Sequence, residues 1–354
     1  MSKNPIEPTN PGAGPEPSRG QAVADASRPT KGVDLPSLDE RSSPAATSHL
    51  SDLARRPILI FGMDRSGTSL VANLVHRWGA FGGTAKNLTQ KGDERNPEGF
   101  FEEPGLQIFL EDFLPSLGAS FWDLSFEERL ADAAQSPEWS SRFQELIEGL
   151  QGSGRPWFWK EPLMGVLYPF WRHFLPDANL LVPIRDPYAS AISWARFYVP
   201  EELRPHCPAI PFNLLRWQRL MTKSLELGNE HGRTKLVSYE DLISDPIAGC
   251  RDLADHLNRR YRIEGNPDQQ ARSMAKAVRQ DLARNRSEIP FHSRPDVPAA
   301  QKDLYAFLLE KLEDPSIDFD PARYPMVLGW REFMQVFEAL IALYRETQGL
   351  GGGS

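Results

Sequence analysis

The chain has 354 residues, of which 40% are hydrophobic and 25% are charged, a composition that supports a packed core and excludes wholesale disorder and fibrous repeats. The mean hydropathy is −0.46 and no apolar run approaches the roughly 18 residues of a membrane-spanning helix, so we expect a soluble protein. The net charge of −8 argues against a general nucleic-acid binder, although a local cluster of cations and N–H groups can still bind a small anion.

The two ends of the chain differ in composition from the part between them. Residues 1–50 contain 8 Pro, 4 Gly and 7 Ser, and the first aromatic residue is Phe61, so this segment lacks the apolar area that would offset its conformational entropy. We predict a disordered tail over residues 1–50 and one folded domain over residues 51–349. Residues 350–354 end in Gly-Gly-Gly-Ser, which is typical of a flexible linker or a remnant of cloning.

The cysteine content and the N-terminus favour a cytoplasmic protein. Cys207 and Cys250 are too few for a disulfide framework, and neither has a neighbour typical of a metal site. The N-terminus lacks the apolar stretch of a secretory signal.

Short apolar runs alternate with segments of helical periodicity between these ends. Near-continuous apolar runs predict buried strands at residues 57–62, 157–159, 179–184 and 235–238. After the first strand, a stripe of apolar side chains from Leu70 to Trp78 predicts an amphipathic helix. Further helices are predicted around residues 139–150, 212–230, 247–258, 268–285 and 330–346. This alternation indicates a parallel sheet with helices on both faces.

The first predicted strand leads into the loop Gly62-Met-Asp-Arg-Ser-Gly67, followed by Thr68-Ser69 and the amphipathic helix. Backbone N–H groups and the positive end of the helix dipole converge there, which predicts an anion site. The spacing is that of a P-loop without its lysine, which weakens an interpretation as an ATP site, and Arg65 supplies a positive charge from within the loop. An ordinary strand–helix turn is the alternative. The predicted fold class is α/β, a three-layer P-loop-type domain with a central parallel sheet flanked by helices.

A second anion site is predicted after the third strand. Arg185 follows that strand, Pro187 suits the first turn of the next helix, and Ser193 lies on that helix. Open α/β sheets bind ligands at the carboxyl ends of their strands, and a guanidinium together with a hydroxyl fits a phosphate. The alternative is that Arg185 pairs with Asp186 or with a surface acid.

Several ordered segments carry a resemblance to a known family. They are GMDRSGTSL at 62–70, NPEGFFE at 96–102, WKEP at 159–162, FLPDANLLVPIRDP at 174–187 and SYEDLISDP at 238–246. Together they resemble the sulfotransferases that depend on 3′-phosphoadenosine-5′-phosphosulfate (PAPS), and most closely the bacterial P-loop type. The similarity covers about residues 55–255.

The resemblance implies that PAPS is the sulfuryl donor and that its product is 3′-phosphoadenosine-5′-phosphate (PAP). It assigns the 5′-phosphosulfate to loop residues Arg65, Ser66, Gly67, Thr68 and Ser69, and the 3′-phosphate to Arg185 and Ser193. The transferred sulfuryl group bears less charge than a γ-phosphoryl group, so no metal ion is required.

The resemblance also implies a catalytic set. Lys160, at the end of the second strand, is similar to the family lysine that stabilises the departing bridging oxygen, and Arg65 adds positive charge. An acceptor hydroxyl needs a general base, commonly His or Glu in this family. We predict Glu102, which follows two Phe residues that would anchor it in partly apolar surroundings. The alternatives are Glu103, Asp93, Glu94 and His76, the last predicted to lie on the surface.

Three further features receive structural interpretations. Glu240-Asp241 is assigned to a structural segment of the family. The aromatic residues around 121–126, 157–159, 170–171 and 194–197 are predicted to be core rather than the lining of an acceptor pocket. The basic stretch 284–294, with Arg284, Arg286, His292 and Arg294, is predicted to be a solvated charge run rather than a segment that closes over a ligand.

The predicted function is in-line transfer of a sulfuryl group from PAPS to an acceptor hydroxyl. A carbohydrate is the first choice of acceptor, and a small metabolite or a peptide is the second. No nucleic-acid partner and no transmembrane segment are expected. The alternatives are a P-loop nucleotide kinase, which would need Mg²⁺ and a loop lysine, and a non-catalytic nucleotide-binding protein.

Overall fold

The computed structural model describes residues 56–83, 96–119, 121, 127–282, 285, 287–327 and 329–347. The predicted tail, residues 1–50, and the predicted linker, residues 350–354, lie outside the described residues. Both stay predictions.

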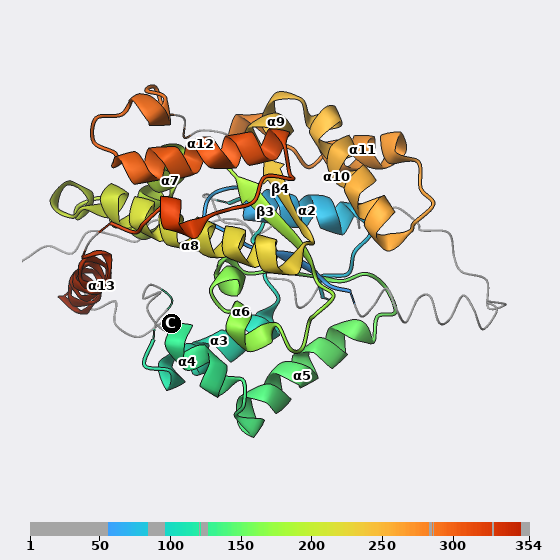
Figure 1. Cartoon of the computed structure of the whole chain (residues 1–354), viewed down its shortest axis with the longest axis horizontal. Helices are drawn as coiled ribbons and strands as arrows, with labels where there is room; N and C mark the ends of the chain where they lie inside the picture. The colour runs from blue at the N-terminus through green and yellow to red at the C-terminus, as the bar shows by residue number, and fades with distance from the viewer. Residues whose placement is uncertain are drawn as a thin grey trace, which may run out of the picture. The chain divides into compact units, whose positions relative to one another are not determined.

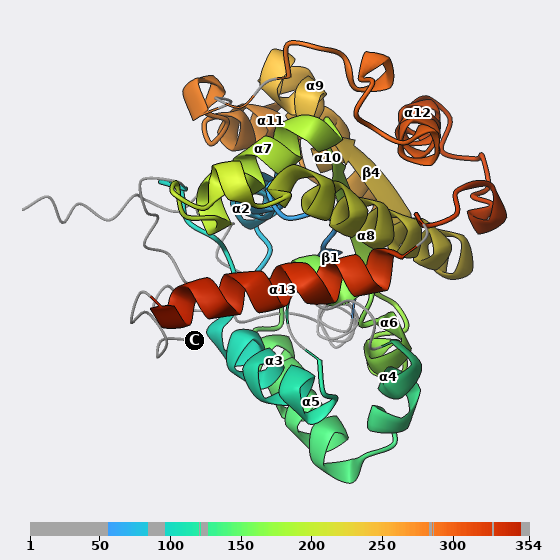
Figure 2. The same cartoon turned by 90° about the vertical axis from the view of Figure 1, so that its left-hand side faces the viewer.

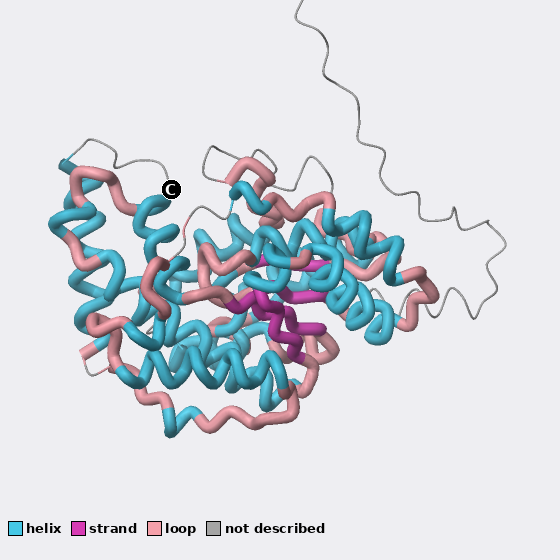
Figure 3. The backbone as a smooth tube through the Cα atoms, turned by 90° about the horizontal axis from the view of Figure 1, so that it is seen from above, coloured by secondary structure: helices cyan, strands magenta, loops and turns pink. Residues whose placement is uncertain are grey.

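Four parallel strands form the centre of the fold. They are β1 (Ile58–Ile60), β2 (Phe158–Lys160), β3 (Asn179–Ile184) and β4 (Thr234–Ser238), in the order β2-β1-β3-β4. All four predicted strands are confirmed, and Figure 3 shows them (magenta) among the helices (cyan). Ile60 of β1 pairs with Lys160 of β2, so these two strands end side by side.

Helices cover both faces of the sheet (Figures 1 and 2). They are α2 (Thr68–Trp78), α3 (Pro104–Ser116), α4 (Glu127–Ala133), α5 (Pro137–Gln151), α6 (Tyr168–Trp171), α7 (Pro187–Tyr198), α8 (Ala209–His231), α9 (Tyr239–Ser244), α10 (Pro246–Tyr261), α11 (Pro267–Ala275), α12 (Ala299–Glu313) and α13 (Trp330–Thr347). Short 3₁₀ turns lie at Pro162–Gly165, Arg204–His206, Gln280–Leu282, Phe291–Ser293 and Pro321–Arg323.

Two hydrophobic cores lie on opposite faces of the sheet. Leu59 packs in the core formed with α3, α5, α6 and α8. Its neighbours Ile58 and Ile60 pack in the other core, formed with α2, α10 and α11. Side chains alternate in this way along a strand, so the three-layer α/β fold class is confirmed.

Most predicted helices are confirmed, and one is too long. The helix predicted over residues 268–285 ends at Ala275. There, the N–H of Ala277 donates to the carbonyl of Met274 at 2.9 Å, and the N–H of Val278 donates to that of Ala275 at 3.0 Å. These bonds tighten the last turn and end the helix. The helices α3, α4, α6, α9 and α12 were not predicted.

The aromatic residues are mainly core, as predicted. Trp157, Trp159, Trp171 and Trp194 are all buried. α13 runs across α8, and the ring of Phe337 stacks on that of Phe212 at 3.9 Å (Figure 2). Within the described residues, no helix combines the length and apolar character needed to cross a membrane.

Candidate active site

A tight loop joins β1 to α2. Gly62 and Gly67 have φ angles of 126° and 102°, in the region that favours glycine. A Cβ atom on Gly67 would lie 2.6 Å from Cδ2 of Tyr239, so residue 67 must be glycine for the loop to approach α9 this closely. α2 begins at Thr68, which places its first N–H groups and its positive dipole end beside the loop, as the sequence predicts.

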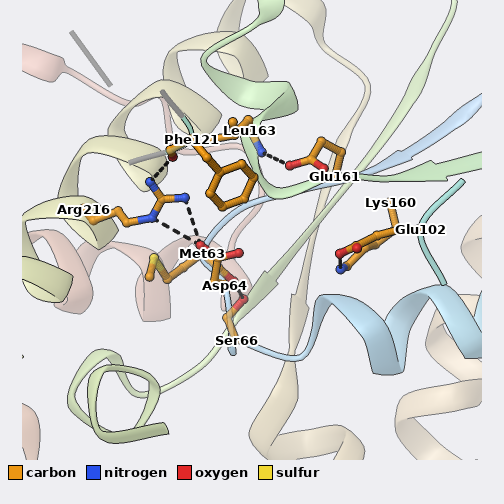
Figure 4. Close-up of polar contacts among 9 residues, drawn as sticks. All are labelled: Met63, Asp64, Ser66, Glu102, Phe121, Lys160, Glu161, Leu163 and Arg216. Carbon is orange, nitrogen blue, oxygen red and sulfur yellow. Dashed lines mark hydrogen bonds and ion pairs between the residues drawn. The ribbon is translucent and has the colours of Figure 1, made fainter. Parts of the chain in front are cut away.

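A buried ion pair holds this loop to α8. Arg216 donates from Nη2 and Nε to Oδ2 of Asp64 at 3.0 and 3.2 Å, and from Nη1 to the carbonyl of Phe121 at 2.9 Å (Figure 4). The side chain of Arg216 is 0% exposed and that of Asp64 is 6% exposed. Because both charges are removed from water, each depends on the other for compensation. The pair therefore fixes the loop relative to α8.

Arg65 reaches from the loop to α7. Its Nε donates to Oγ of Ser193 at 3.3 Å, and its guanidinium carbon lies 4.6 Å from the centroid of the Phe197 ring. The sequence analysis assigned Arg65 and Ser193 to two different anion sites. The structure brings the two side chains into contact.

Arg185 also lies against the loop. It donates to the carbonyl of Arg65 at 2.9 Å and to the carbonyl of Asn285 at 2.7 Å, and its guanidinium carbon lies 4.6 Å from the centroid of the Tyr239 ring. The carboxylate of Asp186 is used elsewhere, since it accepts from the N–H of Ala189 at 2.8 Å and caps α7. Arg185 thus points into the site. The alternative, that it pairs with Asp186 or with a surface acid, is wrong.

One cavity of about 450 Å³ lies between these elements, and we call it the loop cavity. The predicted donor residues that line it are Arg65, Gly67, Thr68, Ser69, Arg185 and Ser193. Ser66 is instead buried, and its Oγ donates to the carbonyl of Met63 at 2.6 Å. The structure therefore gathers the two predicted anion sites around a single cavity.

The loop cavity also contains polar side chains that the sequence analysis did not single out. They are Asn73, Asn96, Glu98, Arg196, Tyr239, Arg279 and Asn285, and Glu98 pairs with Arg279 at 3.3 Å. Arg196 donates to Oδ1 of Asn285 at 2.6 Å. It lies three residues after Ser193 on the same helix, a spacing that could have indicated a shared face. Arg279 comes from a distant segment, for which the sequence carries no comparable signal.

A second polar centre lies at the end of β2, where Lys160 forms an ion pair with Glu102 (Figure 4). The two side chains are 4% and 24% exposed. Phe101 anchors the segment by packing into the core with α2, as the sequence predicts. Neither Lys160 nor Glu102 belongs to the lining of the loop cavity.

Tyr198 of α7 interacts electrostatically with Asp64 and Arg65 of the loop and with Glu102 of the second polar centre. Burial raises the pKa of its phenol, and the negative charges of Asp64 and Glu102 raise it further, whereas Arg216 and Arg65 act in the opposite direction. The phenol therefore stays neutral at physiological pH and keeps its proton for donation.

Glu161 is a further candidate that the sequence analysis quoted only as part of a motif. Its side chain is 1% exposed. It accepts from the N–H of Leu163 at 3.1 Å and from Nε2 of Gln107 at 2.7 Å. Burial, together with the charge of Glu102, raises the pKa of Glu161 to about 7. Glu161 is buried against α3, which is more than fifty residues away in the chain. The residues next to Glu161 in the sequence therefore do not indicate its burial.

Two of the alternatives to Glu102 as base, Glu103 and His76, lie within the described residues. Glu103 caps α3 by accepting from the N–H of Leu106 at 2.7 Å, and His76 is exposed on α2, as predicted. Asp93 and Glu94 lie outside the described residues. Within the described part of the chain, no group of three or more His, Cys, Asp or Glu side chains is placed to hold a metal ion.

The remaining motif residues have structural contacts. Glu240 accepts from the N–H of Asp186 at 3.0 Å. Arg294 pairs with Asp296 at 3.1 Å and lies over the ring of Tyr188. Arg284 and Arg286 of the basic stretch lie outside the described residues.

A comparison with protein families identifies the chain. A family model described as "Sulfotransferase family" matches residues 57–262, more than half of the chain. The chain belongs to the sulfotransferase family. The protein is therefore an enzyme of the PAPS-using type, and the family assignment replaces the two alternatives, a nucleotide kinase and a non-catalytic nucleotide-binding protein.

Solved structures of bacterial sulfotransferases align with this sulfotransferase over most of its length. The sulfotransferase domain of the Synechococcus PCC 7002 olefin synthase is 16% identical, with 80% of this chain and 94% of that chain covered and a TM-score of 0.38. STF1 from Mycobacterium tuberculosis H37Rv is 16% identical, with 75% and 82% covered and a TM-score of 0.38. STF9 from Mycobacterium avium is 13% identical, with 82% and 76% covered and a TM-score of 0.37.

These TM-scores are below 0.5, so the family assignment rests on the family model. No curated protein sequence matches the chain significantly.

Replacement of Asp64 by alanine should destabilise the sulfotransferase by about 3–5 kcal/mol, because the charge of Arg216 stays buried without its partner. The free energy of unfolding, measured by denaturant titration, checks this. The matched control is Asp112→Ala, which breaks the exposed Asp112–Arg142 pair and should change stability little. Equal losses in the two variants would contradict the role given to the buried pair.

Proposed function

We propose that this sulfotransferase transfers a sulfuryl group from PAPS to an acceptor hydroxyl. The observation that carries the proposal is the convergence of the loop with Arg65, Arg185 and Ser193 on one cavity of about 450 Å³. Two separate groups of anion-binding side chains suit a nucleotide with phosphates at two positions. The first N–H groups of α2, which begins at Thr68, lie beside the loop and can bind a phosphate group.

Each group has a proposed role in donor binding. PAPS supplies the activated sulfuryl group and a PAP leaving group. The residues Arg65, Gly67, Thr68 and Ser69, which line the loop cavity, bind the 5′-phosphosulfate. Ser66 supports the loop instead, because its hydroxyl donates to the carbonyl of Met63. Arg185 and Ser193 bind the 3′-phosphate. Arg185 already donates to two neutral carbonyl oxygens, and an anionic phosphate oxygen is a stronger acceptor than a carbonyl.

Glu102 and Lys160 are proposed to carry the chemical step, together with Arg65. Glu102 takes the proton from the acceptor hydroxyl as that oxygen forms its bond to sulfur. Lys160 stabilises the negative charge left on the bridging oxygen when its bond to sulfur breaks, and Arg65 adds positive charge from the loop. The Lys160–Glu102 ion pair holds both side chains in place before the acceptor binds.

We propose a carbohydrate hydroxyl as the first acceptor class, with a small metabolite or a peptide as the second. The test is incubation with PAPS and a panel of glycans, phenols and peptides, with product masses read for added sulfate. Sulfated product that requires PAPS supports the proposal, and the panel member that reacts identifies the class. PAP binding without sulfation of any member would argue against the proposed acceptor classes.

PAP should bind roughly ten- to hundredfold more tightly than AMP, because the Arg185–Ser193 site contacts only the 3′-phosphate and one charge-assisted contact is worth about 1.5–3 kcal/mol. Isothermal titration calorimetry with both nucleotides checks this. Arg185→Gln should lower PAP affinity while leaving AMP affinity nearly unchanged. Equal affinities of the unaltered protein for PAP and AMP would refute the 3′-phosphate assignment.

Glu102→Gln should lower turnover by roughly 10²–10⁴-fold without loss of PAP binding, the usual range for a general base. Lys160→Ala should also lower turnover, but a sulfate donor with a better leaving group should partly restore it, because the defect lies on the leaving-group side. Rates with PAPS and with a more activated donor check the difference. The matched control is Glu103→Gln, which should keep turnover since Glu103 caps α3. Near-normal turnover of Glu102→Gln would place the base elsewhere.

A further inference from the structure

Glu161 and Gln107 form a buried contact that the proposed reaction does not use. Glu161 directly follows Lys160, and its N–H donates to the carbonyl of Ile60 at 3.0 Å, which extends the pairing of β2 with β1. One carboxylate oxygen accepts from Leu163 and the other from Gln107. Burial makes this carboxyl group costly to ionise, whereas the two N–H groups from which it accepts favour the ionised form.

The contact joins the two elements that carry the catalytic pair. Gln107 lies in the first turn of α3, and Glu102 lies two residues before that helix begins at Pro104. Lys160 is the last residue of β2. The Glu161–Gln107 hydrogen bond therefore holds the start of α3 against the end of β2, and with it the carboxylate of Glu102 against the ammonium of Lys160.

The charged groups that face Glu161 come from these same elements. The negative charge of Glu102, in the segment before α3, raises the pKa of Glu161, and the positive charge of Lys160 of β2 lowers it. Leu163 and Gln107 contribute only neutral N–H groups. With a proton on Glu161, the three ionisable side chains sum to zero charge. Without that proton they sum to −1.

We propose that Glu161 is a positioning residue of the sulfotransferase. It holds Glu102 and Lys160 together through Gln107, and it sets the net charge of that group by gaining or losing one proton. This inference rests on the proposed function, because the reaction that Glu161 adjusts is the transfer described above. Neither Glu161 nor Gln107 lines the loop cavity, so PAP binding is independent of both.

The direction of the effect follows from the charges. The protonated form of Glu161 prevails below a pH of about 7, and there Lys160 can offer its charge to the leaving group. Above that pH, the new negative charge opposes the negative charge that develops on the bridging oxygen. A unit charge several ångström from an oxygen that gains about half a unit of charge, at an effective dielectric constant of about 20, changes a rate on the order of tenfold. We expect kcat to fall by that factor as the pH rises through about 7.

Glu161→Gln separates the charge from the contact. The glutamine oxygen can still accept from Leu163, and its NH₂ group can donate to Gln107 once the amide of Gln107 turns over. This variant should therefore keep its fold and lose the decline in kcat above neutral pH. Gln107→Leu removes the contact instead. It should lower kcat roughly three- to tenfold at all pH values by loosening the catalytic pair. The matched control is Glu111→Gln, the same chemical change at an exposed position of α3.

The experiment measures three quantities for each protein. The first is PAP release from PAPS across the pH range from about 5.5 to about 9, with the acceptor panel. The second is the PAP dissociation constant. The third, measured on the free protein, is the carbonyl band of protonated carboxyl groups in pH-difference infrared spectra. We expect a band that titrates near neutral pH in the unaltered protein and in Glu111→Gln, and that is absent in Glu161→Gln, with equal PAP affinities throughout.

The outcomes separate the two proposals. If Glu161→Gln keeps the same pH profile of kcat, or the same infrared band, the role of Glu161 is overturned. If the infrared band behaves as expected but no protein binds PAP or releases it from PAPS, the proposed function fails instead. Weakened PAP binding in Gln107→Leu would show a general disturbance of the fold and would also overturn the positioning role.

Discussion

The buried guanidinium of Arg216 holds together the parts on which the site depends. It binds Asp64 of the loop and the carbonyl of Phe121, and it is itself carried by α8. Removal of such a charge from water is costly, so it is tolerated only where its hydrogen bonds are satisfied. The loop must therefore stay close to α8, and the positions of Arg65 and Gly67 follow from that constraint.

Local charge, not net charge, sets the character of the loop cavity. The chain carries a net charge of −8, yet Arg65, Arg185, Arg196 and Arg279 all line one cavity. Arg65 and Arg185 also bind a hydroxyl and neutral carbonyl oxygens within the protein. These contacts orient the guanidinium groups in advance, so that less conformational freedom is lost when an anion binds.

The pairing of β1 with β2 keeps the loop cavity and the Lys160–Glu102 pair apart but close to each other. β1 leads into the loop. Beside it, β2 ends at Lys160, and Glu161 follows directly. Four arginines and one carboxylate, Glu98, line the loop cavity, whereas Lys160 lies near two carboxyl groups at the end of β2. The phenol of Tyr198 interacts electrostatically with Arg65 at the cavity and with Glu102 at the end of β2. The register of these two short strands thus determines how the loop lies relative to the Lys160–Glu102 pair.

The sequence by itself determined the features that depend on neighbouring residues. Near-continuous apolar runs identified the four strands, and the strand–loop–helix order predicted an anion site at the loop that ends in Gly67, because each signal lies within a few residues. The predicted end of the helix at residue 285 was wrong, since the composition rich in Leu, Ala and charged residues continues past Ala275, where the last turn tightens. Only the tertiary structure decided that Arg196 and Arg279 share a cavity with Arg65, and that α3 buries Glu161. Those outcomes depend on packing between segments far apart in the chain, and burial rather than residue type sets the pKa of a carboxyl group.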